Sequence, residues 1–476
     1  MTRAASLDAA STQLDDGRFF DALARRVAYQ TESDLGAAPP ALAEYLEHEL
    51  SQTLSTLGFH CQSYPNPEPG GGPFLIARRI EDAALPTVLG YGHGDVVNGQ
   101  AGKWRAGLDP WTLKADGPRW YGRGTADNKG QHSICIAALQ SVIAARGGAL
   151  GYNMIFLFET GEEAGSPGLH AFCAAQRQAL RADVLIASDG PRVHADTPTL
   201  FLGSRGAVNF SLRLKSRDRA YHSGNWGGVI SNPGTRIANA VATLVDANGR
   251  MLVEKLRPPP ISNAVRQALS KVEIGGGAED PTLSQGWGEP GLSAAERLIG
   301  WNTIEVLALG GGNAQRPVNA IPSDAVAHCQ LRCVMGTPWN DVAVIVREHL
   351  DAREFSDVRV VIGMAGAPTR LDVEHPWVKW AQQSIEKSSG KPLTILPNLA
   401  GSLPNDAFSE ILGLPTLWVP HSYPACSQHA PDEHLLPAVA REGLRIMAGL
   451  YWDLGEKTAP FFERYSSKAA DFAPQV

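Results

Sequence analysis

Polar residues cluster in four segments between residues 87 and 190, and three of these clusters follow an apolar run: TVLGYGHGD (87–95), GRGTADNKG (122–130), NMIFLFETGEE (153–163) and DVLIASDG (183–190). The apolar runs predict strands at Thr87–Tyr91, Asn153–Phe158 and Asp183–Ala187. From Lys129 to Ile143 apolar residues recur with helical spacing, which predicts an amphipathic helix capped by Asn128. Strands that alternate with helices predict a mostly parallel sheet, whose ligands bind at the carboxyl ends of the strands.

The pattern changes after Leu202. Further elements are predicted as strands at Ala207–Leu214, Thr303–Leu309, Ala325–Cys333 and Pro415–Val419 and as helices at Asn232–Val245 and from Pro376 to about Ser389. We therefore expect an α/β fold in which a three-layer domain with a mostly parallel central sheet comprises residues 1–203 and 373–476. An inserted α+β domain is expected at residues 204–372.

Composition excludes several classes of protein. The 476 residues include 42 lysines and arginines against 49 aspartates and glutamates, a formal net charge of −7. Since nucleic-acid binding needs a basic stripe and a membrane-spanning helix needs about 20 apolar residues, we expect neither a nucleic-acid nor a membrane partner. The first 16 residues do not resemble an export signal and the six cysteines form no CxxC pair, so we expect a cytoplasmic protein with buried, reduced thiols.

Each polar cluster has a chemical interpretation and a plain one. His93–Asp95 can supply a metal ligand with a carboxylate beside it, or it can be a polar turn. Asp127–Asn128 can aim a carboxylate at a metal, or it can only cap a helix. The adjacent carboxylates of Glu162–Glu163 repel each other, so that a cation would stabilise them; one could bind metal while the other acts as a base. An exposed acidic turn is the alternative.

Asp189 and His429 complete a larger set, because each follows a predicted strand. Two histidines and three carboxylates would then meet at one edge of the sheet, which fits two divalent ions about 3.5–4 Å apart that share a carboxylate and a water. Rival signatures are missing from the sequence. His48–Gln52 begins like a zincin motif but ends in glutamine, Gly90–Asp95 lacks the third glycine of a dinucleotide loop, and no P-loop or serine elbow occurs.

In this order, the motifs resemble those of the co-catalytic metallopeptidase family (clan MH), which includes carnosinases and cytosolic dipeptidases, aminoacylases, carboxypeptidase G and related amide hydrolases. The resemblance extends from about Phe19 to Leu450 and is greatest to the carnosinase-type dipeptidases. It implies two divalent ions per chain, Zn²⁺ first, with Mn²⁺ or Co²⁺ as alternatives. The ligands that it implies are His93, Asp127, Glu163, Asp189 and His429, with Asp127 bridging the two ions.

The same resemblance assigns roles to the neighbours of the ligands. It implies that Glu162 is the general base and that Asp95 orients His93. It also implies a cis peptide bond between Asp127 and Asn128. These features would give a hydrolase in which Glu162 takes a proton from a water and hands it to the leaving amine.

The inserted domain also carries matching residues. By the resemblance, residues 204–372 form a lid and dimerisation domain, and His222 reaches the active site of the other subunit of a homodimer. Asn319 and Arg332 resemble lid residues that contact the substrate, the arginine through its carboxylate, and Ser402 resembles a residue of a glycine-serine loop at the same end. Arg332 could instead be an ordinary strand arginine, and Ser402 a plain loop serine.

Three residues depart from the dipeptidase pattern, and all three lie around the expected substrate pocket: Asn319, Ala400 and Asp432. The departures therefore concern the substrate more than the reaction. The expected substrate is a dipeptide or an N-acyl amino acid with a free carboxylate.

Two rival functions remain at this level. One is an N-acyl-amino-acid or other small-amide amidohydrolase, which assays of dipeptides against acylated amino acids would distinguish. The other is a metal-free binding or scaffold protein of the same fold. That interpretation would require a broken ligand set, whereas all five ligands and Glu162 are present.

Overall fold

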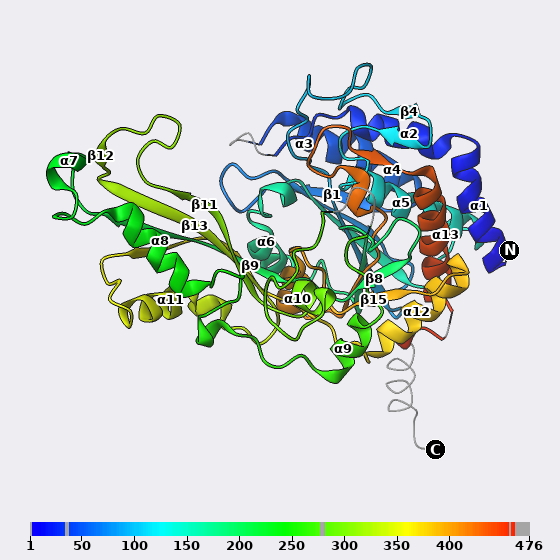
Figure 1. Cartoon of the computed structure of the whole chain (residues 1–476). Helices are drawn as coiled ribbons and strands as arrows, with labels where there is room; N and C mark the ends of the chain where they lie inside the picture. Colours follow the sequence, from blue (N-terminus) through cyan, green and yellow to red (C-terminus); the bar gives the residue numbers. More distant parts are fainter. Residues whose placement is uncertain (1, 34–37, 277–280, 457, 462–476) are drawn as a thin grey trace. The chain divides into compact units, whose positions relative to one another are not determined.

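The chain forms two compact units, each with its own sheet and hydrophobic core (Figure 1). The computed structural model describes residues 2–33, 38–276, 281–456 and 458–461. Unit 1 comprises Met1–Leu202, Leu371–Leu396 and Pro404–Val476, and unit 2 comprises Gly203–Arg370 and Pro397–Leu403. The expected domains differ from these units chiefly at Pro397–Leu403. That segment belongs to unit 2 because its backbone is hydrogen-bonded to residues 203–205.

Unit 1 is built on an eight-stranded sheet in the order β1-β2-β6-β3-β7-β16-β8-β15. The strands are β1 (His60–Tyr64), β2 (Phe74–Arg79), β3 (Thr87–His93), β6 (Asn153–Glu159), β7 (Val184–Ala187), β8 (Thr199–Phe201), β15 (Thr394–Leu396) and β16 (Thr416–Trp418). The central strands β6, β3, β7 and β16 run parallel, whereas β1 and β2 are antiparallel to their neighbours. The predicted α/β class with a mostly parallel sheet is therefore confirmed.

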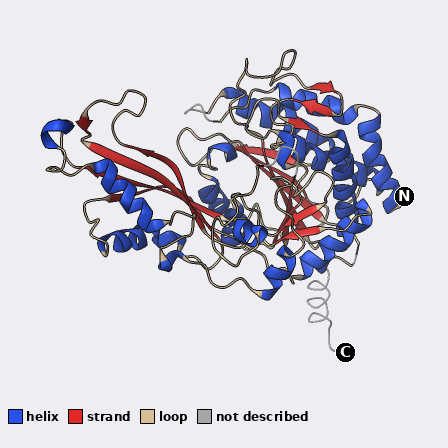
Figure 2. Cartoon of the chain, in the orientation of Figure 1, coloured by secondary structure: helices blue, strands red, loops and turns tan. Residues whose placement is uncertain are grey.

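Helices surround this sheet (Figure 2). The helices of unit 1 are α1 (Arg3–Asp15), α2 (Arg18–Ala28), α3 (Pro40–Glu44), the π-helix η1 (Tyr45–Leu50), α4 (Ser51–Thr56), α5 (Lys129–Ala145), the short η2 (Glu162–Ala164), α6 (Leu169–Ala175), α12 (Pro376–Ser389), η5 (Ala407–Ile411), η6 (Pro424–Cys426) and α13 (Pro437–Leu454). Every residue of β6 and β7 is buried. Apolar side chains on both faces of these strands are what a parallel sheet covered on both sides requires.

The predicted elements agree with the structure except in local detail. The strand predicted to end at Tyr91 continues to His93, so this histidine is itself the last residue of β3. Asn128 does precede α5, but its side chain makes no capping hydrogen bond. Instead it donates to the Ser188 carbonyl (2.8 Å) and accepts from Nδ1 of His132 (3.1 Å). The expectation of a side-chain cap was wrong, because the Ser188 carbonyl and the His132 ring satisfy the asparagine amide in place of the backbone amides of the first turn.

Unit 2 contains a four-stranded antiparallel sheet in the order β11-β13-β9-β14. Its strands are β9 (Gly206–Lys215), β11 (Thr303–Gly310), β13 (Asp324–Cys333) and β14 (Arg359–Gly366), with the short pair β10 (Tyr221–His222) and β12 (Ala320–Ile321). Its helices are α7 (Ser223–Trp226), α8 (Pro233–Leu244), η3 (Glu254–Leu256), α9 (Asn263–Leu269), α10 (Ala294–Ile299), η4 (Trp339–Asp341) and α11 (Val342–Asp351). Apolar residues of α8 and α11 share one core with those of β9 and β13.

The cysteines agree with the expectation of buried, reduced thiols. All six cysteines are free, and all except the half-buried Cys61 are buried. No described helix has both the length and the apolar character that crossing a bilayer takes.

A three-stranded sheet of β4 (Lys114–Asp116), β5 (Arg119–Tyr121) and β17 (His434–Leu435) completes unit 1. It pairs the chain just before Asp127 with the chain just after His429.

Candidate metal centre

The five predicted ligands all belong to unit 1 and lie close to the ends of its elements. His93 ends β3, Glu163 lies in η2 directly after β6, and Asp189 follows β7. Asp127 lies just before α5, and His429 lies in the loop between η6 and β17. Since β3, β6 and β7 are neighbouring parallel strands, their carboxyl ends bring three of the five side chains to one edge of the sheet.

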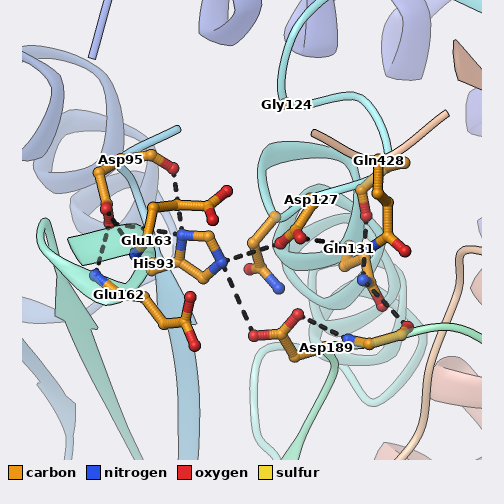
Figure 3. A network of polar contacts seen from close by, with 12 residues as sticks. His93, Asp95, Gly124, Asp127, Gln131, Glu162, Glu163, Asp189 and Gln428 are labelled. Atoms are coloured by element: carbon orange, nitrogen blue, oxygen red, sulfur yellow. Dashed lines mark hydrogen bonds and ion pairs between the residues drawn. The ribbon is translucent and has the colours of Figure 1, made fainter. Parts of the chain in front are cut away.

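The side chains form two groups of three that share one residue. His93, Asp127 and Asp189 form one group, and Asp127, Glu163 and His429 form the other, with the ligand atoms of each group within 4.8 Å of one another. In the first group Nε2 of His93 lies 3.0 Å from Oδ1 of Asp127 and 3.7 Å from Oδ2 of Asp189 (Figure 3).

In the second group Nε2 of His429 lies 3.3 Å from Oδ2 of Asp127 and 3.0 Å from Oε2 of Glu163. Asp127 therefore turns one carboxylate oxygen toward each group. The peptide bond that follows it is cis.

The negative charges of the carboxylates in this centre are not fully balanced by nearby positive charge. Burial, reinforced by the charge of Asp127, raises the pKa of both Asp189 and Glu163 to about 7. Oδ2 of Asp189 is buried without a hydrogen-bond donor in the described part of the chain. A cation between the carboxylates would remove both problems. Imidazole and carboxylate donors suit zinc, manganese or cobalt, so the residues fit a pair of divalent ions.

The two histidines respond to the same excess of negative charge. Burial by itself would lower the pKa of His93, but Asp127 and Asp95 outweigh this effect and hold the pKa well above its ordinary value. Hydrogen bonds to Asp127 and Glu163 raise the pKa of His429 to about 10. Burial opposes the ionisation of Asp127, yet both histidines together keep its pKa below the ordinary range. The histidines thus supply part of the positive charge that the carboxylates require.

Asp95 supports two parts of the centre at once. Nδ1 of His93 lies 3.1 Å from the backbone oxygen of Asp95 and 3.4 Å from its carboxylate. The same carboxylate accepts hydrogen bonds from the backbone amides of Glu162 (3.2 Å) and Glu163 (3.1 Å) and from the Ser33 hydroxyl (2.7 Å). Sequence analysis predicted only the contact with the histidine. The hydrogen bonds from the amides of Glu162 and Glu163 were not predicted, because every residue except proline has a backbone amide and the sequence does not show which amides bind a carboxylate.

Glu162 differs from its neighbour in having a free carboxylate. Its side chain is half-buried, and no hydrogen bond holds its carboxylate among the described residues. Figure 3 shows the side chain extending toward the space beside His93 and Asp189. Burial raises its pKa well above the ordinary range. A free carboxylate beside a candidate cation pair has the geometry of a proton acceptor.

The loop that carries His429 has an unusual backbone. Ser427, His429 and Asp432 have φ values of 60°, 60° and 63°, in the left-handed region that residues other than glycine rarely adopt. Hydrogen bonds from Gln100 and Arg105 hold the loop. Gln100 donates to the His429 carbonyl (3.1 Å), and Arg105 donates to Asp432 through its backbone amide and Nε (both 3.0 Å). Asp432, one of the three departures from the dipeptidase pattern, thus has a structural partner.

Unit 2 holds the remaining predicted residues in two separate pairs. His222 and Asn319 are exposed and adjacent, since Ser223 donates its amide to the Asn319 carbonyl (2.9 Å). Arg332 and Ser402 form the other pair, in which Nη1 of the arginine donates to the serine hydroxyl (2.8 Å). This hydrogen bond joins two residues that lie 70 positions apart in the sequence.

Glu433 is a residue of the centre that sequence analysis missed. Its buried carboxylate accepts hydrogen bonds from the loop that precedes Asp127. Gln428 was missed as well, and its amide donates to Oδ2 of Asp127 (3.2 Å). The only available signal was that both residues flank His429.

A candidate pair of cation sites that shares a carboxylate, at the edge of a mostly parallel sheet, is typical of a metallohydrolase. Comparison with known proteins gives the family. Residues 89–453 match the profile of Peptidase family M20/M25/M40, and the chain belongs to this family. It is a metal-dependent hydrolase of amide bonds, as the sequence predicts.

Two curated relatives and one solved structure illustrate the similarity. The chain is 26% identical to a cysteinylglycine-S-conjugate dipeptidase of Corynebacterium striatum over 77% of this chain and 81% of that protein. It is 34% identical to the beta-Ala-His dipeptidase of Mus musculus over 45% of this chain and 43% of that protein. The crystal structure of human carnosine dipeptidase 1 shares the fold, with a TM-score of 0.76, 21% identity, and coverage of 94% of this chain and 98% of that one.

The geometry predicts that the active protein contains about two divalent ions per chain. A chelator should abolish activity and return of metal should restore it, because the five ligands leave an uncompensated charge when the ions are removed. Metal analysis of protein whose specific activity has been measured on the same sample checks this. Fully active protein with at most one ion per chain would contradict the shared-carboxylate assignment.

Proposed function

We propose that this protein is a dipeptidase that hydrolyses the peptide bond of dipeptides with a free carboxylate, using two zinc ions per chain. The observation that carries the proposal is the pair of three-residue groups that share Asp127, with the free carboxylate of Glu162 beside them. The curated relatives that are dipeptidases by name support the substrate class. Six free thiols fit a reducing compartment such as the cytoplasm.

Each of the predicted site residues in unit 1 has a role in this reaction. His93, Asp127 and Asp189 would hold one ion, and Asp127, Glu163 and His429 the other. When bound, the ions would supply Lewis acidity, which lowers the pKa of water and polarises the scissile carbonyl. Glu162 accepts the proton of the attacking water and passes it to the leaving amine. Asp95 keeps His93 and the glutamate turn in position.

Arg332 and Ser402 are proposed to bind the carboxylate of the substrate. A guanidinium offers two parallel donors that match a carboxylate, and Arg332 forms no ion pair among the described residues. Arg205 adds to the positive charge: it is buried, its Nη1 has no hydrogen-bond partner in the described chain, and burial and Arg332 lower its pKa to about 10. An N-acyl amino acid carries the same carboxylate, so this subsite also admits the broader amidohydrolase activity.

We propose a homodimer in which His222 serves the other subunit, as the family resemblance implies, and the length of β13 supports this proposal. His222 pairs with Ala320, shortly before β13 begins at Asp324, and Arg332 lies near the end of the strand. From Asp324 to Arg332 the chain advances eight residues, or about 26 Å at roughly 3.3 Å per residue. Since a dipeptide is much shorter, it cannot touch both pairs of one subunit, and we assign the histidine to the partner's site.

The edge strand β11 offers a surface for this dimer. Leu307 and Leu309 are 59% and 53% exposed, and Val306 is 39% exposed. An open strand edge with apolar side chains is a surface that another chain covers. We propose that a second copy of this chain does so.

Glu162→Gln should leave metal content unchanged and lower kcat by about 10²–10⁴-fold, because it removes the proton acceptor alone. Glu163→Gln should instead lose metal, because it removes a ligand. Metal analysis and steady-state kinetics on both variants check the two roles. The assignment is wrong if both variants lose metal equally and Glu162→Gln keeps most of its turnover.

Arg332→Ala should lower kcat/KM for a dipeptide by about ten- to a hundredfold, since a charge-assisted hydrogen bond contributes about 1.5–3 kcal/mol. It should hardly change the slow cleavage of the same dipeptide with an amidated end. Arg213→Ala, on an exposed arginine of β9, is the matched control and should behave as wild type. Wild-type cleavage of the amide as fast as the acid would refute the carboxylate requirement and favour the broader amidohydrolase.

Mixing inactive Glu162→Gln chains with inactive His222→Ala chains should restore activity. A heterodimer has one site with both groups intact when His222 acts across the dimer. Native mass spectrometry confirms subunit exchange, and a peptidase assay measures recovery. If activity stays absent after exchange, His222 acts within its own chain or has no role.

A further inference from the structure

A buried carboxylate outside the ligand set holds the loop that leads to Asp127. Glu433 is 1% exposed. Its Oε1 accepts hydrogen bonds from the backbone amides of Ala126 (2.9 Å) and Asp127 (3.1 Å). Its Oε2 accepts from the amide of Gly124 (3.1 Å) and from Nη1 of Arg123 (2.7 Å). All four acceptor positions of this carboxylate are therefore used.

The partners of Glu433 tie together two segments that carry ligands. The loop before Asp127 and the segment after His429 are more than 300 residues apart in sequence, yet one side chain joins them. The backbone adds to the same link, since Gly122 donates to the Glu433 carbonyl (3.0 Å) and His434 pairs with Tyr121. Asp127 and His429 are both members of the second cation group.

Arg123 neutralises Glu433 without reaching the cation groups. Its guanidinium is fully buried and also donates to the Asn98 carbonyl (3.0 Å). The pair therefore places a carboxylate against backbone amides at no net charge. A neutral glutamine could not replace it, because its single oxygen accepts fewer hydrogen bonds and its NH₂ group would face the donors that Glu433 satisfies.

We infer that Glu433, neutralised by Arg123, is a positioning residue that fixes the backbone of Asp127 relative to His429 and so sets the affinity for the second cation. Groups that orient metal ligands typically change metal affinity or activity by about 10–100-fold when mutated. This inference rests on the metal ligands assigned under the proposed function. It adds a role for a buried pair that takes no part in the chemical step.

The test uses cobalt(II) as the probe and full-length, metal-free protein. Cobalt titration followed by absorption gives both the affinity and the ligand-field spectrum, which a general loss of stability would not alter. We expect Glu433→Gln to bind one of two cobalt equivalents about 10–100-fold more weakly, with a changed spectrum. Excess cobalt should restore part of the lost turnover.

Glu49→Gln is the matched control. Glu49 also forms a buried ion pair in unit 1, with Arg26 (3.1 Å), but its carboxylate contacts arginine side chains and no backbone of a ligand loop. This variant should bind cobalt as wild type does. The inference is overturned if Glu433→Gln binds cobalt normally, or if both variants lose affinity equally, since the effect would then be general to broken buried pairs.

A further pair of variants covers the case in which Glu433→Gln does not fold. Arg123→Met/Glu433→Gln removes both charges and therefore leaves no unpaired buried arginine, and Arg26→Met/Glu49→Gln is its control. The inference is again overturned if the Arg123→Met/Glu433→Gln variant binds cobalt normally, or if this variant and its control lose affinity equally. If the wild-type protein itself binds fewer than two equivalents of cobalt, the proposed metal centre is wrong. If the wild-type protein binds two equivalents and the Glu433 variants bind cobalt normally, only the inference about Glu433 is wrong.

Discussion

Repulsion between buried carboxylates is the constraint around which this structure is organised. Asp127 lies with Asp189 on one side and Glu163 on the other, with ligand atoms within 4.8 Å in each group. Two like charges at that separation repel by on the order of 3–4 kcal/mol at an effective dielectric constant near 20. A fold that holds three such groups together needs compensating positive charge, which two histidines supply in part and divalent ions would supply in full.

The scaffold resists this repulsion through backbone contacts. Strand ends deliver His93, Glu163 and Asp189, and each strand is held by its neighbours in the sheet. Two further carboxylates, of Asp95 and Glu433, accept hydrogen bonds from the amides of the ligand loops. Because an amide hydrogen bond fixes the backbone itself, it restrains a ligand more firmly than side-chain packing alone.

Unit 2 adds a constraint of length. Its long strand β13 separates the exposed pair at His222 from the guanidinium of Arg332. A strand rises by a fixed amount per residue, so the two pairs cannot converge on one small molecule within a single subunit. In the proposed homodimer, the exposed apolar side chains of β11 would provide the surface that a second copy of the chain covers.

The sequence by itself determined the class of fold and the candidate ligands. Apolar runs followed at once by His93, Glu163 and Asp189 identify strand ends from local pattern alone, because periodicity and strand ends are local properties. The helix from Lys129 was predicted for the same reason. The five-ligand set was implied by the resemblance of these motifs, in their order, to those of the metallopeptidase family.

Only the tertiary structure decided how these parts act together. It shows that Asp127 turns one oxygen to each group, that Asn128 binds Ser188 instead of capping its helix, and that Pro397–Leu403 belongs to unit 2. It also shows that the Glu433 carboxylate accepts hydrogen bonds from the loop before Asp127, which lies more than 300 residues away in the sequence. These contacts join backbone groups and side chains that are distant along the chain, and a backbone amide is the same at every residue, so no sequence pattern could reveal them.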